Sequence, residues 1–386
     1  MARSSLFGRR VHLSGSLAKS LTDAPTEVAT LARESVVKLV RELVKRGANF
    51  VIPVDVESVR EDGQPLCFDW LVWKTAYECL ATLPSDVPGP MFVAVKHHKT
   101  DGQIPAEYGD LWRTLSRSSH VQIESAAHWN MAGKRMEVQA AYGDILITIG
   151  GGDGVLFLAN LYHDAGKPVV PLNFELCAAD TGSRKLHAFG MSGANASRFF
   201  QCQGSTTPKT WLARIGIGSE TDPKVIADDA LDLLEDLAPP SAFAVRLLNP
   251  AHEDYADVQA FFDVVVEPVI EGELGFKLVV VDGKQGFDHL RMDQEIFAKL
   301  YRSRVVIADI TGSRPNCFLE LGYAMGRGIR TIVTAREGTP HPFDIQTLSA
   351  HHWAANGDVQ ARRRAFREHW DATRNRPIVP VEPLIP

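Results

Sequence analysis

Glu320 is the residue of this sequence whose position best suits catalysis by a carboxylate. The run Val305–Asp309 has the continuous apolar character of a buried strand, and Asn316 precedes a helical pattern. We expect Asn316 to be the N-cap, which places Glu320 in the first or second turn of that helix and Tyr323 on the same face. Glu320 would then look into the crevice outside the carboxyl ends of the strands, where open α/β sheets bind ligands.

A carboxylate in such a crevice could assist the cleavage of a ribosyl C–N bond. That reaction passes through a sugar that resembles an oxocarbenium ion, and an anion beside C1′ lowers the barrier as it does in glycosidases. The helix dipole would keep the carboxylate ionised. The alternative is that Glu320 is an ordinary surface glutamate in the first turns of a helix, where acidic residues are common.

Polar or turn-forming residues follow two neighbouring predicted strands as well. Asn249 and Pro250 follow the run Phe243–Leu248, and Asp282 follows Lys277–Val281. Because the carboxyl ends of parallel strands lie at one edge of a sheet, we expect these residues to border the same crevice as Glu320.

A glycine-rich turn marks a second candidate site in the N-terminal half. The predicted strand Asp144–Ile149 runs into Gly150-Gly151-Gly152-Asp153-Gly154 and then into a helix, so backbone N–H groups could hold a phosphate. The turn is not a Walker A loop, because no Gly-Lys-Ser/Thr follows. It does not open the first βα unit, as a dinucleotide-binding GxGxxG does. A purely structural turn is the alternative.

Alternating strands and helices position both sites. Apolar runs at 11–13, 50–54, 91–96, 144–149 and 168–171 are continuous, which suits parallel strands covered by helices on both faces. The spacing predicts helices over 26–46, 128–142, 155–165 and 223–237. Residues 176–217 have weak periodicity, and we expect them to be irregular with at most one late strand.

The paired prolines of Ala238-Pro239-Pro240-Ser241 mark the best domain boundary, and the βα alternation restarts after them. A length of 386 residues also fits two domains. We therefore expect an α/β protein with two doubly wound, Rossmann-like or flavodoxin-like parallel-sheet domains, at residues 1–238 and 239–386.

Bulk composition excludes several classes of partner. The formal charge of −6 offers no basic surface for nucleic acid or an anionic membrane. No apolar run resembles a secretory signal or a membrane span, so we expect a cytoplasmic protein. The five cysteines lack the spacing of zinc ligands, and we expect no metal and no required cofactor.

The run Val305–Arg327, VVIADITGSRPNCFLELGYAMGR, resembles the signature of the nucleoside 2-deoxyribosyltransferase-like and TIR-like superfamily. A weaker likeness extends from Phe243 to Trp353. The resemblance implies that Glu320 is catalytic and that Asp309 and Asn316 shape the catalytic pocket around the ribose and base. The substrate, NAD or another nucleoside or nucleotide, would contact Asn249, Pro250, Asp282, Gly312, Tyr323, Phe343 and Asp344.

The N-terminal half resembles the SLOG superfamily, which includes LOG enzymes and DprA-like proteins, over 11–172. The likeness rests on Ser14-Gly15-Ser16, Lys134-Arg135-Met136 and the sequence ILITIGGGDGV. LOG enzymes have Thr and a catalytic Glu after the glycines, whereas Val155-Leu156-Phe157-Leu158 stand here, so we expect a nucleotide pocket without the acid. The resemblance implies ligand contacts from Ser14, Gly15, Ser16, Arg135, Gly151, Gly152, Asp153 and Gly154. For Arg135, an exposed helix position is an equal alternative.

Together the two resemblances predict a sensor and effector of the kind found in Thoeris-type anti-phage systems. The SLOG-like domain would sense a small nucleotide signal of the cyclic ADP-ribose type, and the TIR-like domain would hydrolyse NAD or a related nucleotide. Regulation by self-association would make the chain a homo-oligomer. The alternatives are a salvage-type N-glycosidase or deoxyribosyltransferase, and a non-enzymatic nucleotide-binding protein.

Overall fold

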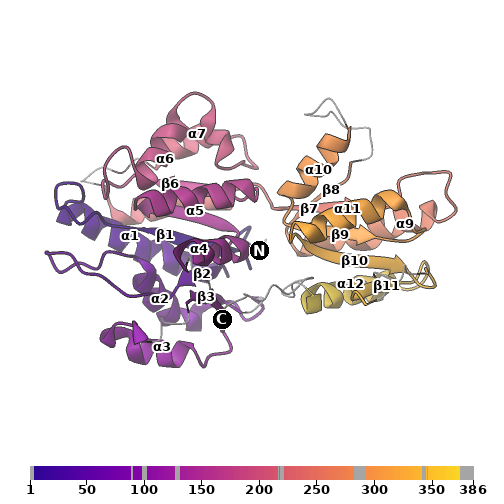
Figure 1. The fold of residues 1–386 in the computed structure, drawn as a ribbon, viewed down its shortest axis with the longest axis horizontal. Helices are drawn as coiled ribbons and strands as arrows, with labels where there is room; N and C mark the ends of the chain where they lie inside the picture. Colours follow the sequence, from indigo (N-terminus) through magenta and orange to yellow (C-terminus); the bar gives the residue numbers. More distant parts are fainter. Residues whose placement is uncertain are drawn as a thin grey trace. The chain divides into compact units, whose positions relative to one another are not determined.

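The structure is a computed structural model of the chain and describes residues 4–87, 90–97, 102–126, 131–215, 217, 221–281, 292–340, 345 and 347–373. The chain divides into two compact units, with the boundary between Ala238 and Pro239 (Figure 1). The N–H of Ala238 donates to the C=O of Gln201 in the first unit, and the C=O of Pro240 accepts from Lys277 in the second. The connector between the units is therefore short.

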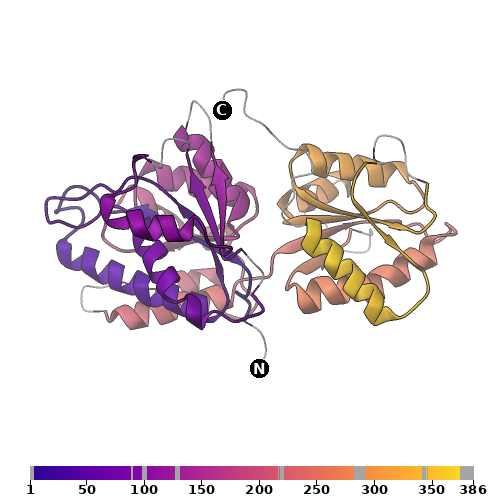
Figure 2. The same ribbon diagram turned by 90° about the horizontal axis from the view of Figure 1, so that it is seen from below.

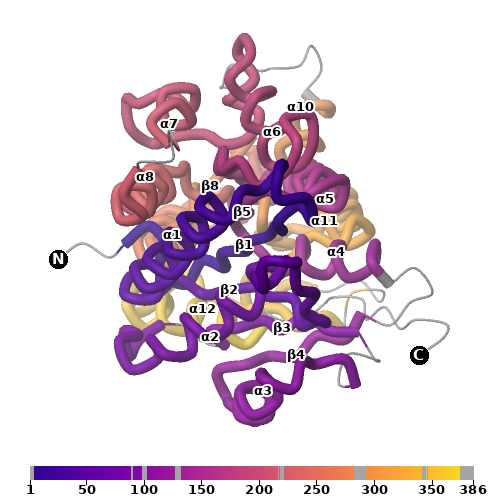
Figure 3. The backbone as a smooth tube through the Cα atoms, turned by 90° about the vertical axis from the view of Figure 1, so that its left-hand side faces the viewer, coloured from indigo at the N-terminus to yellow at the C-terminus, as the bar shows by residue number. Residues whose placement is uncertain are grey.

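A parallel six-stranded sheet forms the centre of the first unit, in the order β4-β3-β2-β1-β5-β6. Figure 3 shows the part of this order from β4 to β5. Its strands are β1 (Arg10–Ser16), β2 (Asn49–Pro53), β3 (Phe92–Lys96), β4 (Val121–Ser125), β5 (Ile145–Gly150) and β6 (Val169–Leu172). The strand order reverses between β1 and β5, which makes the carboxyl ends of these two strands the switch point.

The first unit contains eight described α-helices: α1 (Thr26–Lys45), α2 (Asp69–Glu78), α3 (Gly109–Leu115), α4 (Met131–Tyr142), α5 (Asp153–Asp164), α6 (Gly182–Met191), α7 (Pro208–Arg214) and α8 (Pro223–Glu235). Short 3-10 turns occupy Leu80–Thr82, Ala106–Tyr108 and Asn195–Arg198. Helix α1 buries the apolar stripe that its periodicity predicted, including Val36, Leu39 and Leu43, and it packs against α2 and α8. It ends before Gly47, whose φ of 73° is left-handed.

Two features of the first unit differ from the sequence-based predictions. About half of residues 176–217 is helical, in α6, α7 and one 3-10 turn, where irregular structure was expected; the other half is irregular, and no described strand lies in this stretch. Their weak periodicity reflects short helices with only a few buried positions each. Strand β4 was not predicted, because VQIES is an edge strand whose residues are all partly or fully exposed, so it lacks a continuous apolar run.

The second unit contains a parallel five-stranded sheet in the order β11-β10-β9-β7-β8. Its strands are β7 (Ser241–Val245), β8 (Lys277–Val279), β9 (Val305–Asp309), β10 (Arg330–Arg336) and β11 (Ala350–Trp353). The order reverses between β7 and β9, so the crevice expected for a ligand lies at their carboxyl ends.

Helices cover both faces of this second sheet (Figure 2). They are α9 (Tyr255–Phe261), which continues in π-helical turns at Phe262–Val266 and Pro268–Glu273, α10 (Met292–Arg302), α11 (Pro315–Gly326) and α12 (Val359–Thr373). Alternate residues of β7 face opposite layers: Ala242 and Ala244 join the core with α9 and α12, and Phe243 and Val245 join the core with α10 and α11. Both units are therefore doubly wound, and the predicted α/β fold class is confirmed.

Candidate functional sites

Asp309 ends strand β9 at the switch point of the second unit and is fully buried. Its carboxylate accepts hydrogen bonds from Thr334 Oγ1 at 2.7 Å, Trp353 Nε1 at 2.9 Å and the N–H of Thr311 at 3.1 Å. Burial raises the pKa of Asp309, while these three donors oppose the rise. Both carboxylate oxygens are thus bonded to protein groups, which suits a residue that positions the site better than one that touches substrate.

The loop after β9 meets the loop after β7 at Gly312. Gly312 has a φ of 76°, and a Cβ there would lie 2.9 Å from Cε1 of His252 and 3.2 Å from its Nε2. The N–H of His252 donates to the C=O of Asn249, so the same contact brings the exposed residues Asn249 and Pro250 to this edge. The next residue, Ser313, also adopts a left-handed φ of 48°.

Helix α11 begins two residues earlier than the sequence suggested. Arg314 is its N-cap and Pro315 its first residue, so the prediction that Asn316 is the N-cap is wrong. Proline is favoured at the first helical position because that position needs no N–H donor, and it moves the cap back to Arg314. Asn316 is an exposed residue of the first turn.

Glu320 lies in the second turn of α11 and is partly buried. Burial raises the pKa of its carboxyl group to about 7. This corrects the expectation that the helix dipole holds Glu320 ionised, because the dipole acts mainly within the first turn and desolvation dominates in the second. Tyr323, one turn on, is partly buried and packs against Phe297 with ring centroids 4.8 Å apart.

The structure adds a charged group that the sequence reading missed. The guanidinium of Arg336, at the end of β10, lies 2.5 Å from Asp254 and 2.7 Å from Asp257. The N–H of Arg336 donates to Thr311 Oγ1 at 2.9 Å, which ties β10 to the loop after β9. The acidic residues at the start of α9 could be seen in the sequence, but no sequence pattern indicated that Arg336 is their partner.

Three predicted substrate contacts, Asp282, Phe343 and Asp344, lie outside the described residues.

The glycine turn of the first unit lies against the end of β1. The N–H of Gly151 donates to the C=O of Ser16 at 2.8 Å. A Cβ on Gly15 would lie 1.7 Å from the carbonyl oxygen of Ile149, so β1 and β5 pair here only because position 15 is glycine. Ser14 and Ser16 are partly exposed at the same edge.

Helix α5 starts directly after the turn, with Gly152 as its N-cap and no side chain bonded to the cap. N–H groups in a first helical turn have no acceptor within the helix, so those of Asp153 and Gly154 suit an anion. Both residues are exposed. A Cβ on Gly154 would meet Cε of Met136 at 3.3 Å, which places α4, the helix of Arg135, beside the start of α5.

Arg135 belongs to a cluster of charged residues that was not predicted from the sequence. Its guanidinium forms an ion pair with Asp55, which follows β2, and its Nε is buried with no hydrogen-bond partner. Glu57 accepts the N–H of Cys67 at 3.0 Å, and Asp69 begins α2. These residues stand far apart in sequence and follow different elements, so no local motif could mark them.

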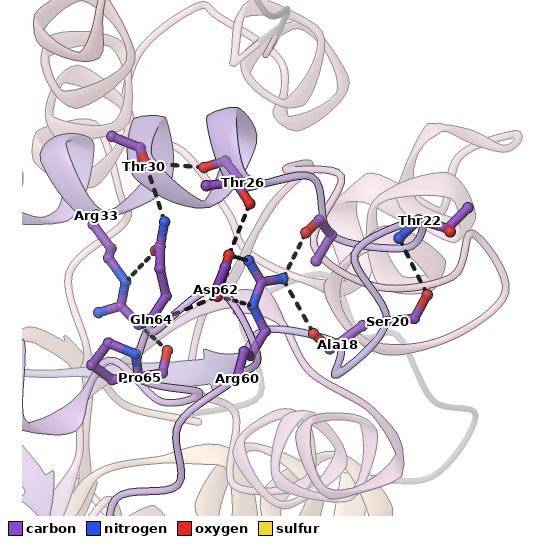
Figure 4. A network of polar contacts seen from close by, with 11 residues as sticks. Ala18, Ser20, Thr22, Thr26, Thr30, Arg33, Arg60, Asp62, Gln64 and Pro65 are labelled. Carbon is purple, nitrogen blue, oxygen red and sulfur yellow. Dashed lines mark hydrogen bonds and ion pairs between the residues drawn. The ribbon is translucent and has the colours of Figure 1, made fainter.

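A buried arginine holds the loops around this cluster in place (Figure 4). Arg60 is ion-paired with Asp62, and its guanidinium also donates to the carbonyl oxygens of Ala18 and Ala24. Asp62 in turn accepts from Thr26 at the start of α1. The loop after β1 is therefore fastened to the loop after β2.

A family model described as ATP nucleosidase Cap17-like, N-terminal, matches residues 6–235, which is more than half of the chain. The chain belongs to this Cap17-like family. The match includes the glycine turn, Arg135 and the charged cluster. None of the curated proteins is detectably similar to the chain in sequence.

Within the Cap17-like region, the positions after the glycines carry no carboxylate. Val155 and Leu158 are buried, and Phe157 is 46% exposed. The residues that replace the Thr and Glu of LOG enzymes are therefore apolar, as their sequence indicated.

The described part of the Cap17-like chain has neither a metal-binding cluster nor a membrane-spanning helix. Across the part that the structure describes, no group of three or more His, Cys, Asp and Glu side chains could hold a metal ion. None of the helices described is both long enough and apolar enough to cross a membrane.

Proposed function

We propose that the chain is a nucleotide N-glycosidase of anti-phage defence, in which the second unit cleaves the glycosidic bond and the first unit binds a nucleotide signal. The observation that carries the catalytic part is Glu320, a partly buried carboxyl group on the helix that follows the switch-point strand β9. Membership in a family of ATP nucleosidases independently supports a nucleotide as substrate.

The proposed reaction breaks the bond between C1′ of the ribose and a ring nitrogen of the base. The bonding electrons leave with the base, and positive charge develops on C1′ and the ring oxygen. Ionised Glu320 stabilises that charge, and a water molecule then adds its hydroxyl to C1′. The proton from that water goes to the departing base when the base is adenine, which leaves with an extra electron pair, and to solvent when the base is nicotinamide, which leaves neutral. Asp309 and Arg336 act indirectly, because they hold the loop 310–314 beside the loop after β7.

The proposed role of the first unit rests on the geometry at the carboxyl ends of β1 and β5. The glycine turn offers backbone N–H groups at the start of α5, and Arg135 adds a guanidinium from the neighbouring α4. This combination suits a phosphorylated ligand. The first unit lacks the catalytic Glu that follows the glycines in LOG enzymes, so we infer that it senses its nucleotide and does not cleave it.

Incubation of the purified full chain with ATP, NAD and a nucleoside panel, followed by chromatography of the products, tests the catalytic proposal. We expect release of adenine from ATP or nicotinamide from NAD. Release only from nucleosides would favour a salvage-type enzyme, and ligand-dependent stabilisation without any base release would favour a binding protein.

Glu320→Gln is the matched variant for this assay. We expect base release to fall at least ~10³-fold, because the amide has nearly the same shape and cannot carry the negative charge. The variant should lose no more than about 1 kcal/mol of unfolding free energy. Glu368→Gln, at an exposed carboxylate on α12, which packs on the other face of the sheet from α11, is the control and should keep wild-type activity. Retention of more than a few per cent of activity in Glu320→Gln would exclude Glu320 as the catalyst.

A further inference from the structure

Two histidines of the second unit lie side by side between the sheet and a helix, one on β11 and one on α12. The imidazole rings of His351 and His369 have centroids 5.7 Å apart. His351 is only 9% exposed, and Nε2 of His369 is buried without a hydrogen-bond partner among the described residues. Because buried polar atoms in proteins are nearly always hydrogen-bonded, this pair is an unusual feature of the core.

Aromatic side chains surround the histidine pair. The ring of Phe261, on α9, stacks on His351 with centroids 6.1 Å apart, and Phe366, on α12, meets His351 edge-on at 5.7 Å. Both phenylalanines belong to the core that α9 and α12 form on this face of the sheet. A charged imidazole in these surroundings would lose its hydration without gaining a hydrogen-bond acceptor from the rings.

The same face of the sheet carries the carboxylate at the switch point. Asp309, Thr334 and His351 are direct neighbours in the register of β9, β10 and β11, so their side chains lie in one row. Thr334 and Trp353, two residues after His351, both donate to Asp309. Phe261 stacks on Trp353 with centroids 4.5 Å apart. The aromatic contacts that hold α12 are therefore continuous with the hydrogen bonds of Asp309.

The folded state disfavours protonation of both histidines. Burial, His369 and His352 lower the pKa of His351 to about 4, and burial and His352 lower the pKa of His369. The groups that shift these two pKa values include no carboxylate, although Asp309 lies in the same row. Below pH 6.5 the unfolded chain therefore binds more protons than the folded chain. The stability that the pair contributes is complete above about pH 6.5 and is lost as the pH falls towards 4.

We propose that the histidine pair makes the docking of α12 on the sheet sensitive to mild acid, so that protonation releases α12 and loosens the contact between Trp353 and Asp309. Two imidazolium ions at this separation repel each other, and release allows both rings to reach water. The second unit thus contains a pH-sensitive contact that acts on the strand ends at its switch point. This inference does not depend on the proposed function.

Hydrogen exchange of the full chain at pH 7 and pH 5, followed by mass spectrometry and corrected for the intrinsic effect of pH, tests the release of α12. Protection of Val359–Thr373 should fall at least about 20-fold at pH 5, the loss that a pKa of about 4 at His351 alone implies. Helix α10 (Met292–Arg302), which packs on the other face of the sheet, is the internal reference and should change much less.

Two substitutions of His351 test whether the pair causes this loss. His351→Phe keeps a ring but has no titratable nitrogen, and His351→Asn is a smaller neutral side chain in case the larger ring does not fit. Each should reduce the loss of α12 protection between pH 7 and pH 5 at least about fivefold. His352→Asn, at an exposed histidine on the same strand, is the matched control and should respond to pH as wild type does. Thermal unfolding at pH 7 shows that each variant is folded.

The indole N–H of Trp353 gives a second measurement. In protein with isotope-labelled tryptophan, its nuclear magnetic resonance signal is assigned with Trp353→Phe, and its exchange with solvent should accelerate at pH 5 beyond the intrinsic effect of pH. Trp73 in the first unit is the reference, because its indole is also buried and donates to the C=O of Pro53 at 3.1 Å.

Equal protection of α12 at pH 7 and pH 5 would overturn the proposal, and so would an equal loss in wild type and both His351 variants. A loss shared equally by α12 and α10 would show that the second unit opens as a whole, which also contradicts the release of α12. An unchanged Trp353 signal would exclude the link to Asp309. All these measurements are made without substrate, so none of them bears on base release.

Discussion

At the scale of single residues, burial shifts the pKa of two carboxyl groups in the described part of the chain towards neutral pH. Glu320 has a pKa of about 7 and Asp69 one of about 8, in both cases chiefly because burial disfavours the charged form. The proposed task of Glu320 requires the ionised state, because only the anion stabilises a cationic sugar.

The activity of the wild-type chain should therefore depend on pH through Glu320. Raising the pH through about 7 deprotonates this carboxyl group, so kcat/KM for base release should rise about tenfold per pH unit below 7 and level off above it. Measurement between pH 5.5 and 8.5 under conditions where the chain stays folded checks this. An activity that falls over that range would mean that protonated Glu320 is the working form.

The same pKa has a consequence for stability. The folded state binds more protons at Glu320 than the unfolded state between the ordinary pKa of 4.5 and about 7, so this residue's contribution to stability is lost as pH rises through that window. At pH 8, Glu320→Gln should therefore be at least as stable as wild type in urea unfolding. A clear loss of stability at pH 8 would show that the carboxylate has a folding role.

At the scale of elements, both sites are built where two strands reverse the order of a sheet. In the second unit, Asp309 joins β9 to β10 through Thr334, to β11 through Trp353 and to the following loop through Thr311. In the first unit, Gly15 lets β1 approach β5 at the glycine turn. In each site, one residue, Asp309 or Gly15, thus determines how closely the ends of neighbouring strands and loops approach.

Asp309→Ala should destabilise the second unit by about 2–4 kcal/mol, because it leaves buried donors on Thr334 and Trp353 unpaired. Turnover by the remaining folded protein should fall, with KM little changed. Urea unfolding and steady-state kinetics measure the two effects. Loss of turnover with unchanged stability would instead indicate that Asp309 contacts the substrate.

Gly15→Ala should destabilise the first unit by about 2 kcal/mol or more, because its Cβ would lie 1.7 Å from the carbonyl oxygen of Ile149. Gly109→Ala is the matched control: it lies at the start of α3 with nothing within 4 Å of its Cβ position, and it should be neutral or slightly stabilising. Urea unfolding of the two variants and of wild type gives the free energies of unfolding that test this prediction. Equal stabilities would show that β1 and β5 can separate here without cost.

At the scale of the whole molecule, a unit that belongs to a nucleotide-cleaving family is linked by a short connector to a second unit with its own candidate catalytic carboxylate. The proposed order of events runs from ligand binding in the first unit to base release in the second. Such control requires that the ligand bind the active state more tightly than the inactive one. Self-association could produce this difference in ligand affinity between the two states. The homo-oligomer stays a prediction, which light scattering can test.

Gly152→Glu tests the coupling between the units. A Cβ at Gly152 would meet only Thr181 Oγ1, at 3.9 Å, so the variant should fold, while the added charge should repel phosphate at the start of α5. We expect loss of binding of a cyclic ADP-ribose-type ligand and of any activity that the ligand stimulates. If stimulation persists while calorimetry shows no binding to the first unit, control by that unit is excluded. Full activity of ligand-free wild type would do the same.

Local pattern in the sequence was sufficient for the fold class and for most strands and helices. The continuous apolar runs of β2, β5 and β9 are buried on both faces, and the stripe of α1 faces the core. These features follow from burial, which acts on each segment separately, so a single chain suffices to predict them. The positions of Glu320 and of Gly151 after strand ends could be predicted in the same way.

Only the tertiary structure decided which groups meet and how strongly each carboxyl group holds its proton. Desolvation, and not the helix dipole, governs Glu320, and that depends on what packs around α11. The partners of Asp309 lie on β10 and β11, and the charged neighbours of Asp69 lie in the loop after β2 and on α4, so sequence periodicity cannot identify either set. Hydrogen bonds and electrostatic shifts act over a few ångströms in space, whatever the separation along the chain, so they appear only once the strands have been placed side by side.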